Sequence, residues 1–285
     1  MEVMKGYKQT EIGVIPYDWD VLNLGKSSVL KARIGWQGLT TAEYLKSGDY
    51  YLITGTDFKE GYIDWDNCVY VEKERYIQDK NIQIKEDDIL VTKDGTIGKV
   101  AFIDKVPKET TLNSGVFVVR PINKVYNQRY LYYVLMSEHF KDFLNRLTAG
   151  STISHLYQKD FVFFDFPKPS LKEQTAIANA LSDTDAWINS LEQLLTKKRQ
   201  IKQGAMQELL QPKEGWEVKK LGEIGKPYGG LSGKAKDDFY NGGFPYIPFM
   251  NIMSNPIIDT SYVDYVNIKQ GEIQNKAQMF DLFFN

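Results

Sequence analysis

The stretch from Pro169 to Pro212 reads PSLKEQTAIANALSDTDAWINSLEQLLTKKRQIKQGAMQELLQP, and it predicts one long helix. Ser170 and Glu173 match the S-x-x-E capping box that begins helices, and Pro212 ends the helical pattern. Acidic residues gather near the start and basic residues near the end, as the helix dipole favours. We therefore expect a helix over 170–211, about 60 Å long at a rise of about 1.5 Å per residue.

Apolar side chains form a stripe along this predicted helix, at intervals of three or four residues and their multiples. The stripe consists of Ile177, Leu181, Ile188, Leu191, Leu195 and Leu209. A helix of this length extends beyond a domain of the size that the chain allows, so the stripe must pack against another long helix. Because the sequence holds no second long helix, we expect the partner helix to be missing or to come from another molecule.

The segment after the helix repeats the beginning of the chain. DWDVLNLG from Asp18 matches GWEVKKLG from Gly215, which pairs Trp19 with Trp216. Three further matches follow in the same order: YLKSGDYYLI from Tyr44 with FYNGGFPYIPF from Phe239, which pairs Tyr51 with Tyr246; YIDWDNCVYV from Tyr62 with IIDTSYVDYV from Ile257; and DDILVT from Asp87 with FDLFFN from Phe280. Four matches in order are not expected by chance, so the sequence indicates one domain and a shortened second copy of it.

The first copy is rich in short strands separated by Gly, Asn and Asp. The predicted strands are DYYLIT (49–54), GYIDW (61–65), CVYVE (68–72), DILVT (88–92), KVAFID (99–104) and GVFVVRP (115–121). One or two helices follow in residues 127–147, where apolar residues recur at near-helical spacing. We predict an α+β fold: a strand-rich domain over 1–169, the spacer helix over 170–211, and a partial second domain over 212–285 that is weakly packed or poorly ordered.

Composition narrows the class of protein. The 285 residues include 42% hydrophobic and 25% charged residues, which is ordinary for a soluble globular protein. A single cysteine, Cys68, excludes an internal disulfide framework, and two histidines are too few for a thiolate–imidazole zinc site. No apolar stretch approaches the length of a membrane span, and the opening residues lack an apolar signal region, so we expect a cytoplasmic protein with no membrane partner.

No motif for catalysis is convincing. DGTIGKV and GGLSGKAK contain glycines and a lysine, but neither has the spacing or the Ser/Thr of a phosphate-binding loop. Neither His139 nor His155 has a recognisable nucleophile and supporting carboxylate. We therefore predict that the chain is not an enzyme and uses no cofactor and no metal.

Binding features are stronger, because three polar segments lie between the predicted elements. They supply hydroxyl, amide, ammonium and guanidinium groups, which contact phosphates and base edges in protein–DNA complexes. The candidate DNA-binding residues are Lys31, Arg33, Trp36 and Gln37 in LKARIGWQG; Thr92, Lys93, Thr96 and Lys99 in LVTKDGTIGKVAF; and Arg146, Ser151, Thr152 and Ser154 in NRLTAGSTISH. Each segment alone is best read as a solvated turn, but together, without catalytic residues, they favour a recognition module.

The chain resembles the specificity (S) subunit of type I restriction–modification enzymes. The resemblance rests on GVIPYDWDVLNLG, DILVTKDGTIGKVAF, NSGVFVVRP, GSTISHLYQKDF and the long helical stretch from Pro169. It implies a target recognition domain that reads one half of a split double-stranded DNA site, and a helix that sets the gap between the halves. It also implies docking of the methyltransferase (M) subunit on the helix and, through the complex, an ATP-dependent restriction (R) subunit, with no catalysis by the chain itself.

The sequence departs from that family pattern because the second copy ends at MFDLFFN, before a second KDGTIGK loop and a second long helix. Three interpretations stay open: a fragment of a longer protein, a truncated or phase-switched gene, or a half-subunit that pairs with a second copy through the stripe. The rival class is a β-rich protein–protein scaffold on a coiled-coil stalk that binds no nucleic acid, which the net charge of −2 favours.

Overall fold

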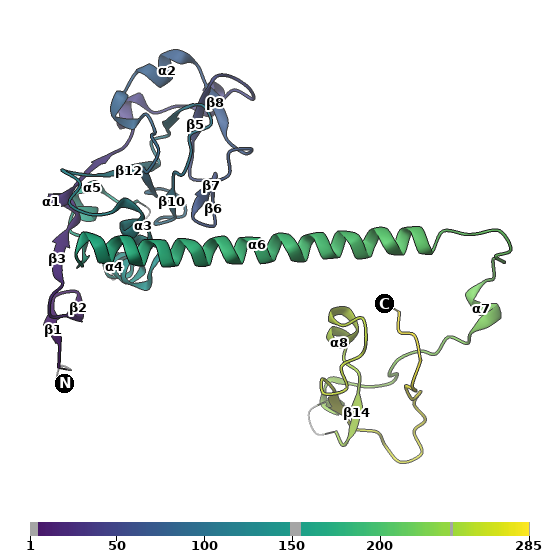
Figure 1. Cartoon of the computed structure of the whole chain (residues 1–285). Helices are drawn as coiled ribbons and strands as arrows, with labels where there is room; N and C mark the ends of the chain where they lie inside the picture. The colour runs from purple at the N-terminus through teal and green to yellow at the C-terminus, as the bar shows by residue number, and fades with distance from the viewer. Residues whose placement is uncertain (1–4, 149–154, 240–241, 285) are drawn as a thin grey trace. The chain divides into compact units, whose positions relative to one another are not determined.

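A computed structural model describes residues 5–148, 155–239 and 242–284 (Figure 1). The chain divides into two compact units, residues 1–202 and 203–285. Helix α6 (Leu171–Leu209) belongs mainly to the first unit and continues into the second. None of the helices within the described ranges combines the length and the apolar content that crossing a membrane requires.

A four-stranded antiparallel sheet, in the order β10-β9-β12-β4, forms the centre of the first unit. Its strands are β4 (Ser28–Lys31), β9 (Ile89–Thr92), β10 (Val100–Phe102) and β12 (Val116–Pro121). Strand β9 is a run of apolar and β-branched residues without polar alternation, which is typical of strands buried on both faces. Both faces are covered, because Ile89 and Val91 join one apolar core while Leu90, pointing the other way, joins another.

Helices cover one face of this sheet and a second sheet covers the other. The first core contains side chains from α3 (Gln128–Met136) and α4 (Glu138–Thr148). The second core contains side chains from a three-stranded sheet, in which β11 (Glu109–Leu112) is parallel to β5 (Tyr50–Ile53) and β5 is antiparallel to β8 (Val69–Val71). The first unit is therefore built of three layers, with the central sheet in the middle.

Smaller elements complete the first unit. Three two-stranded pairs are formed by β1 (Tyr7–Thr10) with β2 (Gly13–Pro16), β3 (Asp20–Asn23) with β13 (Asp165–Lys168), and β6 (Phe58–Lys59) with β7 (Tyr62–Ile63). The short helices are α1 (Leu24–Ser27), η1 (Gly35–Gln37), η2 (Thr41–Glu43), α2 (Lys73–Ile77), η3 (Lys80–Ile82) and α5 (Gln158–Phe161).

The strand predictions for the first copy are confirmed, since each of the six predicted segments contains an observed strand. The predicted helical region over 127–147 forms two helices, α3 and α4, that are separated at Ser137. Ser137 has extended backbone angles (φ −82°, ψ 168°) and caps α3 by donating its backbone N–H to Val134. The break turns α4 onto the first core, where Phe140 is fully buried.

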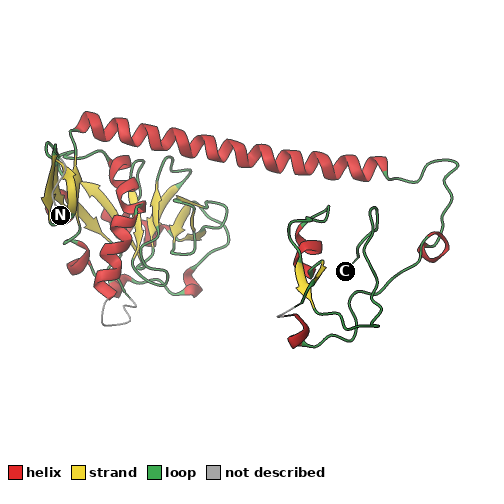
Figure 2. Ribbon diagram, turned by 90° about the horizontal axis from the view of Figure 1, so that it is seen from below, coloured by secondary structure: helices red, strands yellow, loops and turns green. Residues whose placement is uncertain are grey.

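Helix α6 is a single unbroken helix (Figure 2), as the capping signals predict. The capping box is present: the Ser170 backbone N–H and hydroxyl donate to Glu173 Oε2 over 2.9 and 2.7 Å, and the Glu173 backbone N–H donates to Ser170 Oγ over 3.3 Å. Gln174 and Ala178 are buried on the first unit, which anchors the beginning of the helix. The Gln174 amide bonds to the carbonyl of Pro169 and accepts the backbone N–H of Asn127.

Replacing Ser170 by alanine is expected to lower the free energy of unfolding by about 1 kcal/mol, because the first turn of α6 loses its side-chain cap. Urea unfolding followed by circular dichroism measures the change. Ser190→Ala is the matched control, since Ser190 is exposed in the middle of α6 and bonds only back to Ala186. Equal stability of the two variants would contradict a stabilising role for the cap.

The described residues leave the stripe of α6 uncovered over most of its length. Ile177, its first member, packs against the first core. Exposure of the remaining members ranges from 41% for Leu181 to 64% for Leu209. A row of half-exposed leucine and isoleucine side chains on one helix indicates a surface that another chain covers.

The second unit reproduces part of the first. Its elements are α7 (Leu221–Ile224), η4 (Lys236–Phe239), β14 (Phe244–Tyr246), α8 (Phe249–Ser254) and β15 (Asp264–Val266). Helix α7 occupies the repeat position of α1, and β14 pairs with β15 antiparallel as β5 pairs with β8. A partial second copy of the first domain is therefore confirmed by the matching ladders.

One detail of the repeat alignment is wrong. In the ladders, Tyr246 pairs with Asp264 as Leu52 pairs with Val69, so Tyr246 corresponds to Leu52 and not to Tyr51. The connection between the paired strands holds one more residue in the second copy than in the first. The sequence alignment used one offset for both strands and so omitted this extra residue, which the hydrogen-bond register places between them.

The second unit buries little apolar surface. Among its described residues, Pro248 and Val266 are the buried apolar side chains, whereas Val218, Ile273 and Phe280 are more than 90% exposed. Residues 282–284, which correspond to residues 89–91 of β9 in the repeat, form no strand. In the first copy β9 pairs with β10 and β12. Weak packing of residues 212–285 stays a prediction, and this exposure supports it.

Candidate nucleic-acid interface

Several predicted residues gather at one edge of the central sheet. Strands β4 and β9 end at this edge and β10 and β12 begin there, because β12 is antiparallel to both β4 and β9, and β10 is antiparallel to β9. Lys31 is the last residue of β4, Lys93 follows β9, and Lys99 precedes β10. We call the exposed or half-buried side chains Lys31, Lys93, Thr96, Lys99 and Arg146 the loop edge.

Thr92 shapes the loop that carries three of these residues. Its hydroxyl donates to the carbonyl of Thr96 over 2.5 Å and accepts the backbone N–H of Lys99 over 2.9 Å. Gly98 has a positive φ of 80° and packs under Leu144 of α4, so a side chain at this position would clash. Thr92 is fully buried with its hydroxyl bonds satisfied, so it holds the loop in shape and is not itself a surface contact, which corrects its predicted role.

The segment from α4 to α5 lies beside the same loop. Leu156 donates its backbone N–H to the carbonyl of Lys93 over 2.8 Å, and Nδ1 of the His155 ring contacts the Asp94 carboxylate. Arg146 is exposed on the last turn of α4. The predicted contacts Ser151, Thr152 and Ser154 lie outside the described residues, between Arg146 and His155.

The cations of the loop edge are unpaired. Within the described part of the chain, no carboxylate forms an ion pair with Lys31, Lys93, Lys99 or Arg146. The Lys93 ammonium lies 5.3 Å from the centre of the Phe117 ring, and such a contact leaves the charge available to a second partner. Unpaired cations at one edge give a local basic face on a chain of net charge −2.

Arg33 is not at the surface, and its predicted contact with DNA is corrected accordingly. Its side chain is 1% exposed, and the guanidinium donates to the carbonyls of Leu112 and Arg75, to the Gln78 amide and to the Thr111 hydroxyl over 2.8–3.2 Å. Burial, and then the nearby Arg75, lower the pKa of Arg33 from its ordinary value. Arg33 therefore ties β11 to α2.

Gln37 is also buried, with 8% exposure, and its Oε1 atom finds no hydrogen-bond partner among the described residues. Its predicted contact with a base edge is therefore not supported by its position. Trp36 lies in the short helix η1, and its side chain is outside the described set.

The prediction missed two residues that adjoin the loop edge. Tyr157 is 53% exposed, and the Lys159 ammonium lies 5.4 Å from the centre of its ring. The His155 ring also packs against the Tyr157 ring, with 4.6 Å between ring centres. An aromatic residue between basic ones is a usual feature of nucleic-acid surfaces, so HLYQK was the signal that could have identified them.

The histidine and cysteine side chains, which are the most reactive types in the chain, are engaged in structural contacts. The His139 ring bonds to the carbonyl of Asp165 over 2.7 Å, and burial raises the pKa of the Cys68 thiol. Across the described ranges, no group of three or more His, Cys, Asp and Glu side chains is placed to hold a metal ion.

Residues 18–203 match the family model of the type I restriction modification DNA specificity domain, which is more than half of the chain. The chain belongs to this specificity-domain family. The matched region includes the central sheet, the loop edge and most of α6. Membership of the specificity-domain family does not favour the scaffold alternative.

Two relatives in the family come from Methanocaldococcus jannaschii. The specificity subunit of the type I restriction enzyme MjaIX is 27% identical over 92% of this chain and 64% of its own length. The MjaVIII specificity subunit is 28% identical over 74% of this chain and 50% of its own length. The chain thus spans between half and two thirds of these relatives. The crystal structure of the S subunit of a type I restriction–modification system from M. genitalium aligns with a TM-score of 0.47 at 16% identity, over 69% of this chain and 47% of that one.

Proposed function

We propose that this chain reads one half of a bipartite double-stranded DNA site, as a non-catalytic specificity subunit of a type I restriction–modification complex. The observation that carries the proposal is the loop edge: unpaired cations of β4 and of the β9–β10 loop lie at one end of the central sheet, inside the family-matched region. The relatives named above are specificity subunits, which supports the same role.

The loop edge offers both kinds of contact that DNA reading needs. Lys31, Lys99 and Arg146 supply charges for phosphates, which position the protein on the duplex. The Thr96 hydroxyl and the backbone around Gly95 lie at the tip of a loop whose shape Thr92 fixes, and polar groups of this kind read base edges in the major groove. Tyr157 and Lys159 extend the surface along the neighbouring segment.

In this proposal α6 is the spacer and the docking element. Residues 1–169 form the recognition domain, 170–211 the spacer, and 212–285 the partial second domain. The exposed stripe binds the methyltransferase subunit, and through that complex the restriction subunit, or pairs with the stripe of a second copy. The complex acts on DNA in the cytoplasm.

Binding of the chain and the methyltransferase subunit to a library of duplexes tests this function. We expect retained duplexes to share a sequence, and the logarithm of the affinity to fall with the logarithm of salt concentration by about 0.9 for each phosphate contact. Lys99→Ala is expected to weaken binding to all duplexes alike. It should also reduce the slope of log affinity against log salt concentration by about 1. Fluorescence anisotropy over a salt series measures both quantities.

Lys105→Ala is the matched control for this experiment. Lys105 is exposed but follows the other end of β10, away from the loop edge, so its removal should leave affinity and slope within error of the parent. Retention without sequence preference and without salt dependence would instead support the protein–protein scaffold.

A further inference from the structure

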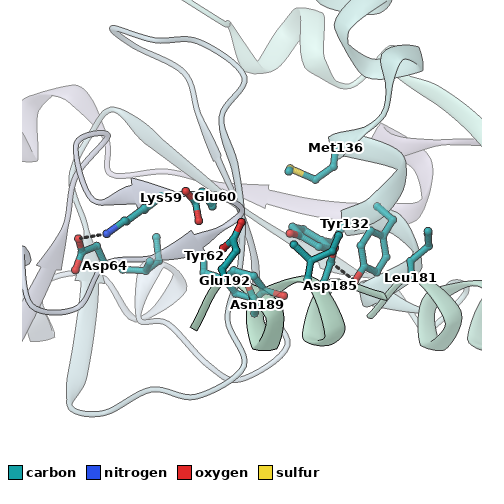
Figure 3. A pocket seen from close by; sticks show the side chains of 13 residues that line it. Lys59, Glu60, Tyr62, Asp64, Tyr132, Met136, Leu181, Asp185, Asn189 and Glu192 are labelled. Atoms are coloured by element: carbon teal, nitrogen blue, oxygen red, sulfur yellow. Dashed lines mark hydrogen bonds and ion pairs between the residues drawn. The ribbon is translucent and has the colours of Figure 1, made fainter. Parts of the chain in front are cut away.

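A groove of about 490 Å³ lies between the β6–β7 hairpin, α3 and the first half of α6 (Figure 3). It adjoins the end of β10 opposite the loop edge, since Phe102 donates its backbone N–H to the carbonyl of Gly61 in the hairpin turn. Its walls combine tyrosines, carboxylates and apolar side chains, among them Tyr62, Tyr132, Tyr133, Asp185, Ile188 and Glu192. The proposed DNA contacts use none of these residues.

One tyrosine hydroxyl at the wall of the groove has no hydrogen-bond partner among the described residues. The Tyr132 side chain is 2% exposed, and its hydroxyl lies against Gly61, where positive φ and the absence of a side chain allow the close approach. No hydrogen bond joins this hydroxyl to any described residue, whereas the neighbouring Tyr133 hydroxyl donates to Asp185 Oδ2 over 2.7 Å. Figure 3 shows the Tyr132 oxygen directed toward the hairpin side of the groove. A tyrosine hydroxyl that is free at the wall of a groove can donate to or accept from a group bound there.

The groove carries an excess of negative charge. Four carboxylates line it, those of Glu60, Asp64, Asp185 and Glu192, against the single ammonium of Lys59. Lys59 lies 3.8 Å from Asp64, and within the described ranges no cation forms an ion pair with the other three. Arg129 interacts electrostatically with Tyr133, but it already forms an ion pair with Asp104.

The walls are suited to an organic cation. The ring of Tyr132 lies 4.9 Å from that of Tyr133 and 6.4 Å from that of Tyr62, measured between centres, so three aromatic rings stand beside the carboxylates. Aromatic faces and carboxylates together hold ammonium and guanidinium groups. The carboxylates themselves do not converge into a metal site in the described structure.

We infer that this groove binds an arginine or lysine side chain of a protein partner that lies along α6. Leu181 and Ile188 of the exposed stripe line the groove, and the stripe continues beyond it through Leu191 and Leu195. A protein segment that inserts a cationic side chain covers this apolar surface as well, whereas a free polyamine would leave it in water. The inference does not depend on DNA binding, because the groove and the loop edge share no residue.

Binding of N-acetyl-arginine amide and N-acetyl-lysine amide to the full chain tests the inference, with ring-labelled tyrosine followed by NMR. We expect shifts of the groove tyrosine signals with a dissociation constant on the order of 1 mM, as expected of ligands of this size. The neutral analogue N-acetyl-citrulline amide should produce no saturable shift. The double variant Asp185→Asn, Glu192→Gln should weaken binding about ten-fold or more.

Asp183→Asn is the control for charge, because Asp183 lies on the same helix outside the groove and its removal should leave binding unchanged. Tyr132→Phe, which keeps the ring and its packing, should weaken binding by roughly three-fold or more. Equal binding of the citrulline probe, or equal losses with Asp183→Asn and with the groove variants, would refute the site. Spermidine binding that is more than ten-fold tighter at the same residues would assign the groove to free polyamines and overturn a protein side chain as the occupant.

Discussion

Replacing Arg33 by alanine is expected to destabilise the first unit by roughly 3–5 kcal/mol, the largest loss that any single change among the candidate site residues should cause. The guanidinium is 1% exposed and satisfies four acceptors on β11 and α2, including the carbonyl of Leu112 at 2.8 Å. Alanine removes the donor from the buried Leu112 carbonyl and Thr111 hydroxyl and opens a cavity between the two elements.

Urea or thermal unfolding of the purified variant measures this loss. Lys31→Ala is the control, because Lys31 lies two residues earlier, is exposed, and should change stability by no more than about 0.5 kcal/mol. Arg33→Lys keeps the charge but loses the forked donor geometry, so it should fall between alanine and the parent. A variant at Arg33 with parental stability and lost DNA affinity would instead restore the surface role first predicted.

The contrast between Lys31 and Arg33 shows where sequence reasoning fails. Both cations were expected at the surface because they lie in the polar segment LKARIGWQG, whose residue types are suited to phosphates and base edges. Strand β4 ends at Lys31, and the turn of the chain after it directs Arg33 inward toward Leu112. The direction of that turn depends on β11, about eighty residues away along the chain, and no local pattern contains this information.

Local sequence signals, by contrast, correctly predicted the structure that depends on neighbouring residues alone. The capping box at Ser170 and the apolar stripe define α6 because helix hydrogen bonds and side-chain spacing are local. Strands β3 and β13 were not predicted, because each is four residues long and is stabilised by pairing across the chain, Asp20 with Lys168. The acidic groove was missed for the same reason, since Tyr62, Tyr132 and Asp185 come from three separate segments.

The loop edge was partly predictable. Lys93, Thr96 and Lys99 were found because a polar glycine-bearing loop between two apolar strands is visible in the sequence. Its meeting with Lys31 follows from the strand order β10-β9-β12-β4, which places the ends of β4 and β9 at one edge. Strand order is a property of the assembled sheet, so the sequence could propose the members of the surface without showing that they lie together.

Introducing glutamate at both Leu191 and Leu195 is expected to abolish assembly through α6, with a loss of affinity of at least about 100-fold. The two side chains are 51% and 52% exposed in the described structure, so their apolar surface is free to be covered by another helix. Burying two leucine side chains contributes more than about 2.7 kcal/mol, and an unpaired buried carboxylate adds a further cost. The helix itself should persist, since glutamate has a high helix propensity.

Molecular mass in solution, with and without the methyltransferase subunit, measures this assembly, and circular dichroism at 222 nm checks the helix. The double variant Gln193→Glu, Gln200→Glu adds the same charge at exposed positions off the predicted stripe and should assemble like the parent. If the leucine variant also assembles like the parent, the stripe faces water in the complex and the spacer-helix proposal is wrong. The leucine variant alone is expected to lose assembly, and it should still bind arginine amide in the groove without DNA. That result would show that the apolar contact of α6 and the charged contact beside it are separate.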